Sequence, residues 1–330
     1  MKALVYTDTC EVTFREEPEP EVPEGEALIA VSAVGICGSD MHAWHGHDPR
    51  RVPPLILGHE VAGRALTGLY AGRPVVVNPL VTCGACAYCQ GGRSNLCERR
   101  ELIGMRRAGA MAERLSIPER NLIPLPDGAD PRKAALTEPA ATGVHALNLA
   151  ERILYRPLCE LSALVLGGGS VGLLTALQLR ARGCRSVVLA ETNPLRRRAA
   201  ADLCDLDVWD PAGEPGPADG SVDLVVDAVG GAVTRAAAVR AVKPGGVIAH
   251  VGLMDNAPGL DVRRLTLAEV TFFGTYTYTH QDLVSAAEML LSGALGDLSW
   301  AESRPLSGGA AAFRDLDAGA TAAAKIVLTP

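Results

Sequence analysis

The stretch "SALVLGGGSVGLLTALQLRARG", residues 162–183, decides the fold of the central part of the chain. It begins with an apolar run, passes through the pattern G-x-G-x-x-G at Gly167, Gly169 and Gly172, and continues as an Ala- and Leu-rich segment with helical spacing. An acid, Glu191, ends the next apolar run about twenty residues later. The glycine pattern alone is a weak signal. Strand, glycine loop, helix and acid in this order indicate a dinucleotide-binding Rossmann unit rather than a glycine-rich turn without a ligand.

The glycine loop is expected to hold the pyrophosphate of the dinucleotide. Gly167 allows the tight turn after the strand, Gly169 lets the backbone approach the pyrophosphate, and Gly172 permits close packing of the helix on the strand. Ser170 and Val171 complete the loop at the N-terminus of the helix, where unpaired backbone N–H groups favour an anion. We predict that these five residues form the cofactor-binding loop.

Glu191 and Arg196 bear on the choice between NAD and NADP. The carboxylate of Glu191 can accept both ribose hydroxyls of NAD and would repel the 2′-phosphate of NADP. The run Arg196-Arg197-Arg198 points the other way, because it could neutralise that phosphate, unless these arginines lie on the solvent face of the next helix. NAD is therefore the expected cofactor, with NADP as the alternative.

The rest of the chain divides around this unit. A chain of 330 residues is too long for one ordinary core and suggests two domains. Buried apolar strands alternate with helices from about residue 143, which is typical of a doubly wound parallel sheet, whereas the first part is β-rich with many prolines and glycines. We predict a Rossmann domain over residues 143–275 and a second domain over 1–142, to which 276–330 returns.

Charge and hydropathy exclude several classes of partner. The net charge of −7 opposes phosphate backbones, so nucleic acid is not an expected partner. No apolar run is long enough to span a bilayer, and "MKALVYTDTC" lacks the apolar core of a signal peptide. We therefore expect a cytoplasmic protein without a membrane partner. The nine cysteines are then thiols or metal ligands rather than disulfides.

The stretch "VTCGACAYCQGGRSNLCERR", residues 81–100 and here named the cysteine lobe, holds four of these thiols. Cys83, Cys86, Cys89 and Cys97 can fill a tetrahedral zinc shell, which leaves no open position for a substrate, so the predicted site is structural. A nucleic-acid-binding zinc ribbon would more often show two C-x2-C pairs a dozen or more residues apart.

Three scattered motifs suggest a second, catalytic metal. "VGICGSDMHAW" offers Cys37, "LGHEVAG" offers His59 and "LTEPAATGVHA" offers Glu138, with Glu60 as a further candidate. A catalytic zinc takes about three protein ligands and keeps one open position. Spacing alone does not establish such a site, because residues this far apart are more often structural.

Together these motifs resemble the zinc-dependent medium-chain dehydrogenases/reductases, the alcohol dehydrogenase superfamily. "GICGSD", "GHE", the cysteine lobe, "EP", "GGGSVG" and "AKIVL" occur in that family's order along nearly the whole chain. The versions "CGSDMHAW" and "TEPAATGVHA" look closest to the sorbitol/polyol and threonine dehydrogenase branch. The resemblance implies a partly open β-barrel (GroES-like) catalytic domain, an inserted Rossmann domain, two zinc ions per chain and a homodimer or homotetramer, usually assembled through edge strands such as "EVTFFGTY".

The resemblance also implies roles for individual residues. Cys37, His59 and Glu138 would surround the catalytic zinc, and whether Glu60 or Glu138 binds it directly stays open. Ser39 would accept the alcohol proton and His42 would pass it toward solvent, with a turn hydroxyl and a surface histidine as the alternatives. The implied reaction is NAD-linked oxidation of a secondary alcohol, such as a polyol, sugar alcohol or cyclitol, to a ketone. An L-threonine or other amino-alcohol dehydrogenase and an inactive zinc-bearing binding protein are the alternatives.

Two departures from the family pattern limit the substrate prediction. The hairpin after "GHEVAG" is shortened and carries Gly72-Arg73 instead of a Gly-Asp pair. Sorbitol dehydrogenases usually hold the polyol with an Arg-Tyr pair, but here Thr277 precedes Tyr278. Trp44, Tyr276 and Tyr278 are the candidate pocket walls, with core packing as the alternative.

Overall fold

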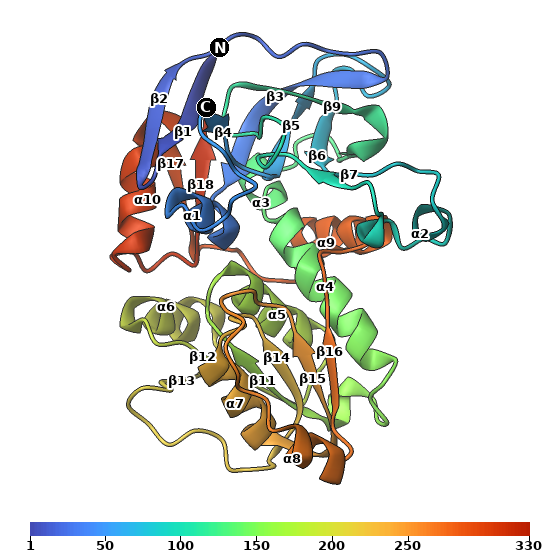
Figure 1. The fold of residues 1–330 in the computed structure, drawn as a ribbon, viewed down its shortest axis with the longest axis vertical. Coiled ribbons are helices and arrows are strands. Elements are labelled where there is room, and N and C mark those ends of the chain that lie inside the picture. The colour runs from blue at the N-terminus through green and yellow to red at the C-terminus, as the bar shows by residue number, and fades with distance from the viewer.

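A computed structural model describes the whole chain, residues 1–330, as two halves built around separate sheets. In Figure 1 the lower half is green to orange and the upper half combines the blue N-terminal and red C-terminal segments. This arrangement confirms the predicted combination of a GroES-like half and a Rossmann half. None of the helices combines the length and apolar character that a membrane crossing would need.

The lower half is a six-stranded parallel sheet in the order β13-β12-β11-β14-β15-β16. Numbered within the half, this is the order 3-2-1-4-5-6 of a dinucleotide-binding fold. The strands are β11 (Ser162–Leu166), β12 (Ser186–Ala190), β13 (Asp207–Trp209), β14 (Val222–Asp227), β15 (Val242–His250) and β16 (Thr271–Gly274). The helices are η3 (Leu158–Glu160), α5 (Ser170–Ala181), α6 (Pro194–Cys204), α7 (Ala232–Ala241) and α8 (Val262–Leu267).

Both faces of this sheet are covered, which explains its continuous apolar strands. Along β11, Ala163 and Val165 join the core that contains α5, whereas Leu164 and Leu166 join the core that contains α7. Successive residues of a strand point to opposite faces, so a strand buried on both sides shows no polar alternation. The doubly wound prediction is thereby confirmed.

The upper half contains two sheets. The smaller has the order β2-β1-β4, with β1 (Lys2–Asp8), β2 (Glu11–Glu16) and β4 (Leu55–Ile56). The larger has the order β10-β6-β5-β3-β18-β17, and β9 also pairs with β3. Its strands are β3 (Glu26–Gly35), β5 (Glu60–Ala65), β6 (Pro74–Val77), β9 (Arg114–Pro118), β10 (Leu122–Pro124), β17 (Ala301–Pro305) and β18 (Lys325–Thr329).

Residues from both ends of the sequence therefore share one sheet. Strand β18 lies between β3, to which it is antiparallel, and β17, to which it is parallel. The C-terminal strands thus lie in the same sheet as β3. Short helices complete this half: α1 (Gly38–Trp44), η2 (Glu119–Asn121), α3 (Pro131–Ala134), η4 (Leu306–Gly308) and α10 (Gly309–Asp317).

Helix α4 (Thr137–Glu151) joins the halves and packs against α9 (His280–Leu291). This helix begins at Thr137, before the predicted start of the Rossmann domain at Gly143. Pro139 lies in its first turn, where the missing N–H is not needed for an intrahelical bond. The predicted boundary between residues 142 and 143 consequently falls inside a continuous helix.

The cysteine lobe projects from the upper half beside α9 (Figure 1). It is bounded by the two-stranded pair β7 (Leu80–Val81) and β8 (Glu101–Leu102), and its only helices are α2 (Ala87–Gln90) and η1 (Ser94–Leu96). So little regular structure cannot bury a core of its own, which leaves the four thiols to hold the lobe together.

Candidate functional site

Cys37, His59 and Glu60 converge at the inner end of the larger sheet of the upper half. Cys37 is the N-cap of α1. Glu60 is the first residue of β5, and His59 directly precedes it after Gly58, whose φ of +92° makes the turn. One ligand atom from each of the three residues lies within 4.8 Å of the others. A thiol, an imidazole and a carboxylate at this separation match the donor set of a zinc ion.

Unpartnered polar atoms show that this cluster suits a cation. His59 Nδ1 and Glu60 Oε2 are buried without a hydrogen-bond partner, as is Oδ1 of Asp40, which lies 3.5 Å from His59 Nδ1. Burial alone would lower the pKa of His59, but the nearby Asp40 and Cys37 outweigh it and raise that pKa well above its ordinary value. A buried carboxylate oxygen without a donor is costly, and a metal ion would satisfy Glu60 Oε2, whereas His59 Nδ1 and Asp40 Oδ1 face each other.

Asp40 is a functional candidate that the sequence interpretation missed. It is fully buried, and one of its oxygens accepts a hydrogen bond from the Cys37 backbone N–H at 3.0 Å. Its other oxygen faces His59. A carboxylate in that position can orient a metal-binding imidazole. The signal was present in the motif "CGSD", in which an acid follows the thiol at helical spacing.

Glu138 lies close to this cluster but outside the set within 4.8 Å. Its Oε1 accepts a hydrogen bond of 2.8 Å from the hydroxyl of Tyr278. Burial is the main cause that raises the pKa of Glu138 to about 7, and the neighbouring Glu60 adds to it. Between the two acids that the sequence left open, the structure brings Glu60 nearer to Cys37 and His59. A metal role for Glu138 stays a prediction.

Lys325 is a second residue that the sequence interpretation missed, and its ammonium group neutralises the carboxylate of Glu60. Its Nζ lies 2.6 Å from Glu60 Oε1 and donates a second bond of 2.6 Å to the Ile36 carbonyl, and both charged side chains are buried. A lysine inside the apolar strand "AKIVLT" was the available signal, because lysine is rarely buried unless it is paired. Gly35 makes room for the acid, since a Cβ there would lie 2.0 Å from Glu60 Oε2.

Ser39 and His42 both lie on α1, next to the cluster. The Ser39 hydroxyl accepts a 3.2 Å bond from the guanidinium of Arg51, whose buried side chain also pairs with Asp48. His42 is exposed, and partial burial, its histidine neighbours and Arg51 lower its pKa. On one helix, the half-buried Ser39 hydroxyl lies nearer to Cys37 and the exposed His42 lies nearer to solvent, which is the order that proton release would need. The proton relay itself stays a prediction.

The three predicted pocket walls have different surroundings. Trp44 is buried in the core, 6.2 Å from the ring of Phe313, so its contacts are those of core packing. Tyr278 is buried and points its hydroxyl at Glu138. Tyr276 is half-buried beneath the guanidinium of Arg100, which lies 4.8 Å from its ring centroid. Of the three, only Tyr278 makes a side-chain hydrogen bond to an acid next to the cluster.

The glycine loop has the geometry that the sequence pattern requires. Gly167 has a φ of +99°, and a Cβ at Gly172 would lie 1.8 Å from the Gly167 carbonyl oxygen. The tight turn and the close packing are thus confirmed. Gly169 caps α5, with Ser170 and Val171 in its first turn, and no heavy atom lies within 4 Å of a Cβ built on Gly169. This open side leaves room for a pyrophosphate, and binding of the pyrophosphate there stays a prediction.

Glu191 and Arg196 are already paired with each other. The Nε of Arg196 donates to Glu191 Oε2 at 3.0 Å, and a second guanidinium nitrogen donates to Oε1 at 3.1 Å. The Gly168 backbone N–H donates to the same carboxylate at 3.0 Å. Burial raises the pKa of Glu191, but the bonds from Arg196 and the backbone lower it on balance. The acid is thus ionised beside the glycine loop, with a cation next to it.

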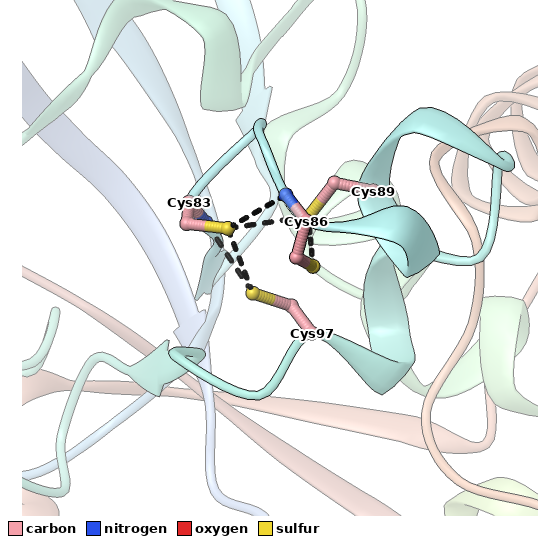
Figure 2. Close-up of side chains that lie close together, drawn as sticks. All are labelled: Cys83, Cys86, Cys89 and Cys97. Atoms are coloured by element: carbon pink, nitrogen blue, oxygen red, sulfur yellow. Dashed lines mark hydrogen bonds between the residues drawn. The ribbon is translucent and has the colours of Figure 1, made fainter.

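The four thiols of the cysteine lobe face one another (Figure 2). Their sulfur atoms lie within 4.8 Å of each other, and the backbone N–H of Cys86 donates to the sulfur of Cys83 at 3.4 Å. Such backbone donors lower the pKa of Cys83 to about 5, so that it favours the thiolate form that binds metals. The cluster fits a structural zinc ion with a complete shell of thiolates.

Comparison with known proteins identifies the family. Residues 23–127 match the model of the alcohol dehydrogenase GroES-like domain, and residues 170–292 match that of the zinc-binding dehydrogenase. The chain belongs to the zinc-dependent medium-chain dehydrogenases/reductases. It is an oxidoreductase of the alcohol dehydrogenase superfamily, as its motifs predicted.

Characterised relatives cover most of the chain. The L-galactonate-5-dehydrogenase of Escherichia coli (strain K12) is 33% identical over 89% of this chain and 88% of its own length. The sorbitol dehydrogenase of Bacillus subtilis (strain 168) is 31% identical over 85% and 83%. A zinc-binding dehydrogenase from Sinorhizobium meliloti 1021, solved with NADP, is 28% identical with a TM-score of 0.86 and covers 100% of this chain and 99% of that one.

Proposed function

We propose that this dehydrogenase oxidises one secondary hydroxyl of a sugar acid or polyol to a ketone and transfers the hydride to NAD. The observation that carries the proposal is the cluster of Cys37, His59 and Glu60, in which the imidazole and the carboxylate are buried. Ser39 follows Cys37 by two residues on α1. A zinc ion bound by this cluster would act as a Lewis acid on the alcohol oxygen. Ser39 would relay the alcohol proton, accepting it while its own hydroxyl proton leaves toward His42 and solvent. The hydride would pass to the nicotinamide, so that alcohol and NAD⁺ give ketone, NADH and a proton.

The substrate class is supported by the relatives. The relatives named above act on L-galactonate and sorbitol, and both compounds are polyhydroxylated chains. Threonine dehydrogenases are also similar, but an example from Chelativorans sp. (strain BNC1) aligns over only 62% of this chain.

The test is a substrate screen on the zinc-loaded protein. Sugar acids, polyols and L-threonine are offered with NAD or NADP, and NADH absorbance and zinc content are measured. We expect turnover of a sugar acid or polyol with two zinc ions per chain. Turnover of L-threonine alone would favour the amino-alcohol alternative, and zinc binding without turnover of any alcohol would favour a zinc-bearing binding protein.

Cofactor preference is tested at the acid beside the glycine loop. In Glu191→Ala the ribose hydroxyls lose their acceptor, while Arg196 is released from its bidentate pair and becomes free to bind a 2′-phosphate. The ratio of kcat/KM for NADP to that for NAD should therefore rise. An unchanged ratio would mean that Glu191 does not discriminate between the cofactors.

We also propose that the protein forms a homodimer through β16. This strand pairs only with β15, so one edge of the six-stranded sheet is available for another strand. A second copy could pair with the same edge. Light scattering of the wild type and of Phe272→Pro, which removes a backbone donor within β16, should show a dimer and a monomer respectively.

A further inference from the structure

The segment between β16 and α9 is clamped at both ends, and one of the clamps comes from the cysteine lobe. Asn95, a buried residue of η1, donates a hydrogen bond of 2.9 Å from its side-chain amide to the Tyr276 carbonyl. Two residues later, Tyr278 donates its hydroxyl to Glu138 at 2.8 Å. In Figure 1 the lobe extends alongside α9, close to where this segment enters that helix.

Thr277 lies between the two clamps in an unfavourable backbone conformation. Its φ is +46°, which is an outlier for a β-branched residue. Such a conformation persists only where the surroundings fix it on both sides, and it is common at functional sites. Asn95 bonds the peptide group that immediately precedes Thr277, so it fixes the plane from which the chain turns.

The same segment offers polar groups that no protein atom satisfies. The hydroxyl oxygens of Thr275 and Thr277 are buried without hydrogen-bond partners. A buried hydroxyl without a partner is costly and requires an explanation. A polyhydroxylated substrate or the cofactor would supply partners, provided that the segment keeps its position beside Glu138.

We infer that Asn95 is a positioning residue: from the cysteine lobe it holds residues 275–278 in the conformation that binds the substrate. Arg100 supports it by covering the ring of Tyr276. Cys97 lies between these two residues and closes the four-thiol cluster, so the lobe presents both contacts from a braced loop. The lobe therefore serves the reacting site, although all of its thiols are directed to one another.

The test compares Asn95→Ala with Ser94→Ala, a neighbour in the same turn whose side chain makes no hydrogen bond. In Asn95→Ala we expect kcat/KM for the alcohol to fall by about tenfold or more, because a small displacement of a positioning group is costly. KM for NAD and the two zinc ions per chain should stay at wild-type values. Ser94→Ala should resemble the wild type in every respect.

A second readout is independent of turnover. Hydrogen exchange of peptides covering residues 275–279 should become faster in Asn95→Ala and stay unchanged in Ser94→Ala. This arm does not depend on the proposed substrate, whereas the kinetic arm rests on the proposed function. A wild type that turns over no alcohol would therefore refute the function and leave the exchange result to decide the inference.

Two outcomes would overturn the inference. The first is wild-type kcat/KM together with wild-type exchange in Asn95→Ala. The second is a loss in kcat/KM accompanied by an equal loss in affinity for NAD, since that would indicate a general disturbance. If Asn95→Ala loses the lobe zinc, Asn95→Leu decides by the same criteria, because it fills a similar volume without a donor and without a charge.

Discussion

Replacing Lys325 by Met tests whether the buried pair with Glu60 stabilises the upper half. Lys325 and Glu60 have side-chain exposures of 1% and 0%, and their charged atoms lie 2.6 Å apart. Removing one partner of such a pair leaves an uncompensated buried charge, which costs about 3–5 kcal/mol. The Ile36 carbonyl loses its donor as well. We therefore expect the free energy of unfolding of the zinc-free protein to fall by about 3–5 kcal/mol in urea.

The matched control is Lys243→Met. Lys243 lies 2.8 Å from Asp223, but its own side chain is 30% exposed. Asp223 also accepts hydrogen bonds from the backbone N–H and the hydroxyl of Ser162, so it keeps partners when the lysine is removed. The expected loss is only about 1 kcal/mol. The reasoning is refuted if Lys325→Met costs no more than Lys243→Met.

Zinc and a second substitution refine the same test. A bound zinc ion would give the Glu60 carboxylate another cation, so the loss in Lys325→Met should shrink in the zinc-loaded protein. Glu60→Gln removes the unpaired charge, and the double variant should recover at least half of the loss. Equal losses with and without zinc would show that Glu60 does not approach the metal.

Three further changes have definite expected outcomes. Cys89→Ser should release one zinc ion per chain and lower the thermal midpoint before activity declines, as measured by metal analysis and calorimetry; a retained zinc would contradict the four-thiol site. Ser39→Ala should lower turnover by about tenfold or more while both zinc ions stay bound, and unchanged turnover would remove Ser39 from the relay. Burial raises the pKa of Asp282, but hydrogen bonds from His145 and Thr279 lower it to about 2, which is below its value in the unfolded chain. The ionised Asp282 therefore stabilises the fold above about pH 4, and this contribution is lost as the pH falls toward 2. In His145→Ala the thermal midpoint should depend less steeply on pH in that window, and an identical slope would contradict the assignment.

The sequence predicted those sites whose residues lie close together along the chain. The glycine loop, its strand and its helix lie within one continuous stretch, and the turn at Gly167 and the packing at Gly172 follow from residue type. The four thiols of the cysteine lobe are likewise close in sequence. In both cases spacing alone brings the side chains together.

The parts that sequence did not reveal depend on distant pairings. Lys325 reaches Glu60 because β18 is inserted beside β3, so the two residues meet across 265 positions. No local pattern marks such a pair, although a lysine within an apolar strand hinted that it had a partner. The contact between Asn95 and Tyr276 spans 181 positions and arises only when the cysteine lobe folds against the segment before α9.

The position of β18 also fixes the order in which the chain can assemble. All six strands of the Rossmann sheet are translated one after another, so that half can fold while synthesis continues. The larger sheet of the upper half must wait, because its member between β3 and β17 follows the entire Rossmann sheet in the sequence. Until then β3 has an open edge and Glu60 has no counter-ion, and such an edge can pair with other chains. The half that is made first is thus completed last, and a nascent chain stalled before β18 is the form most exposed to aggregation and to chaperones.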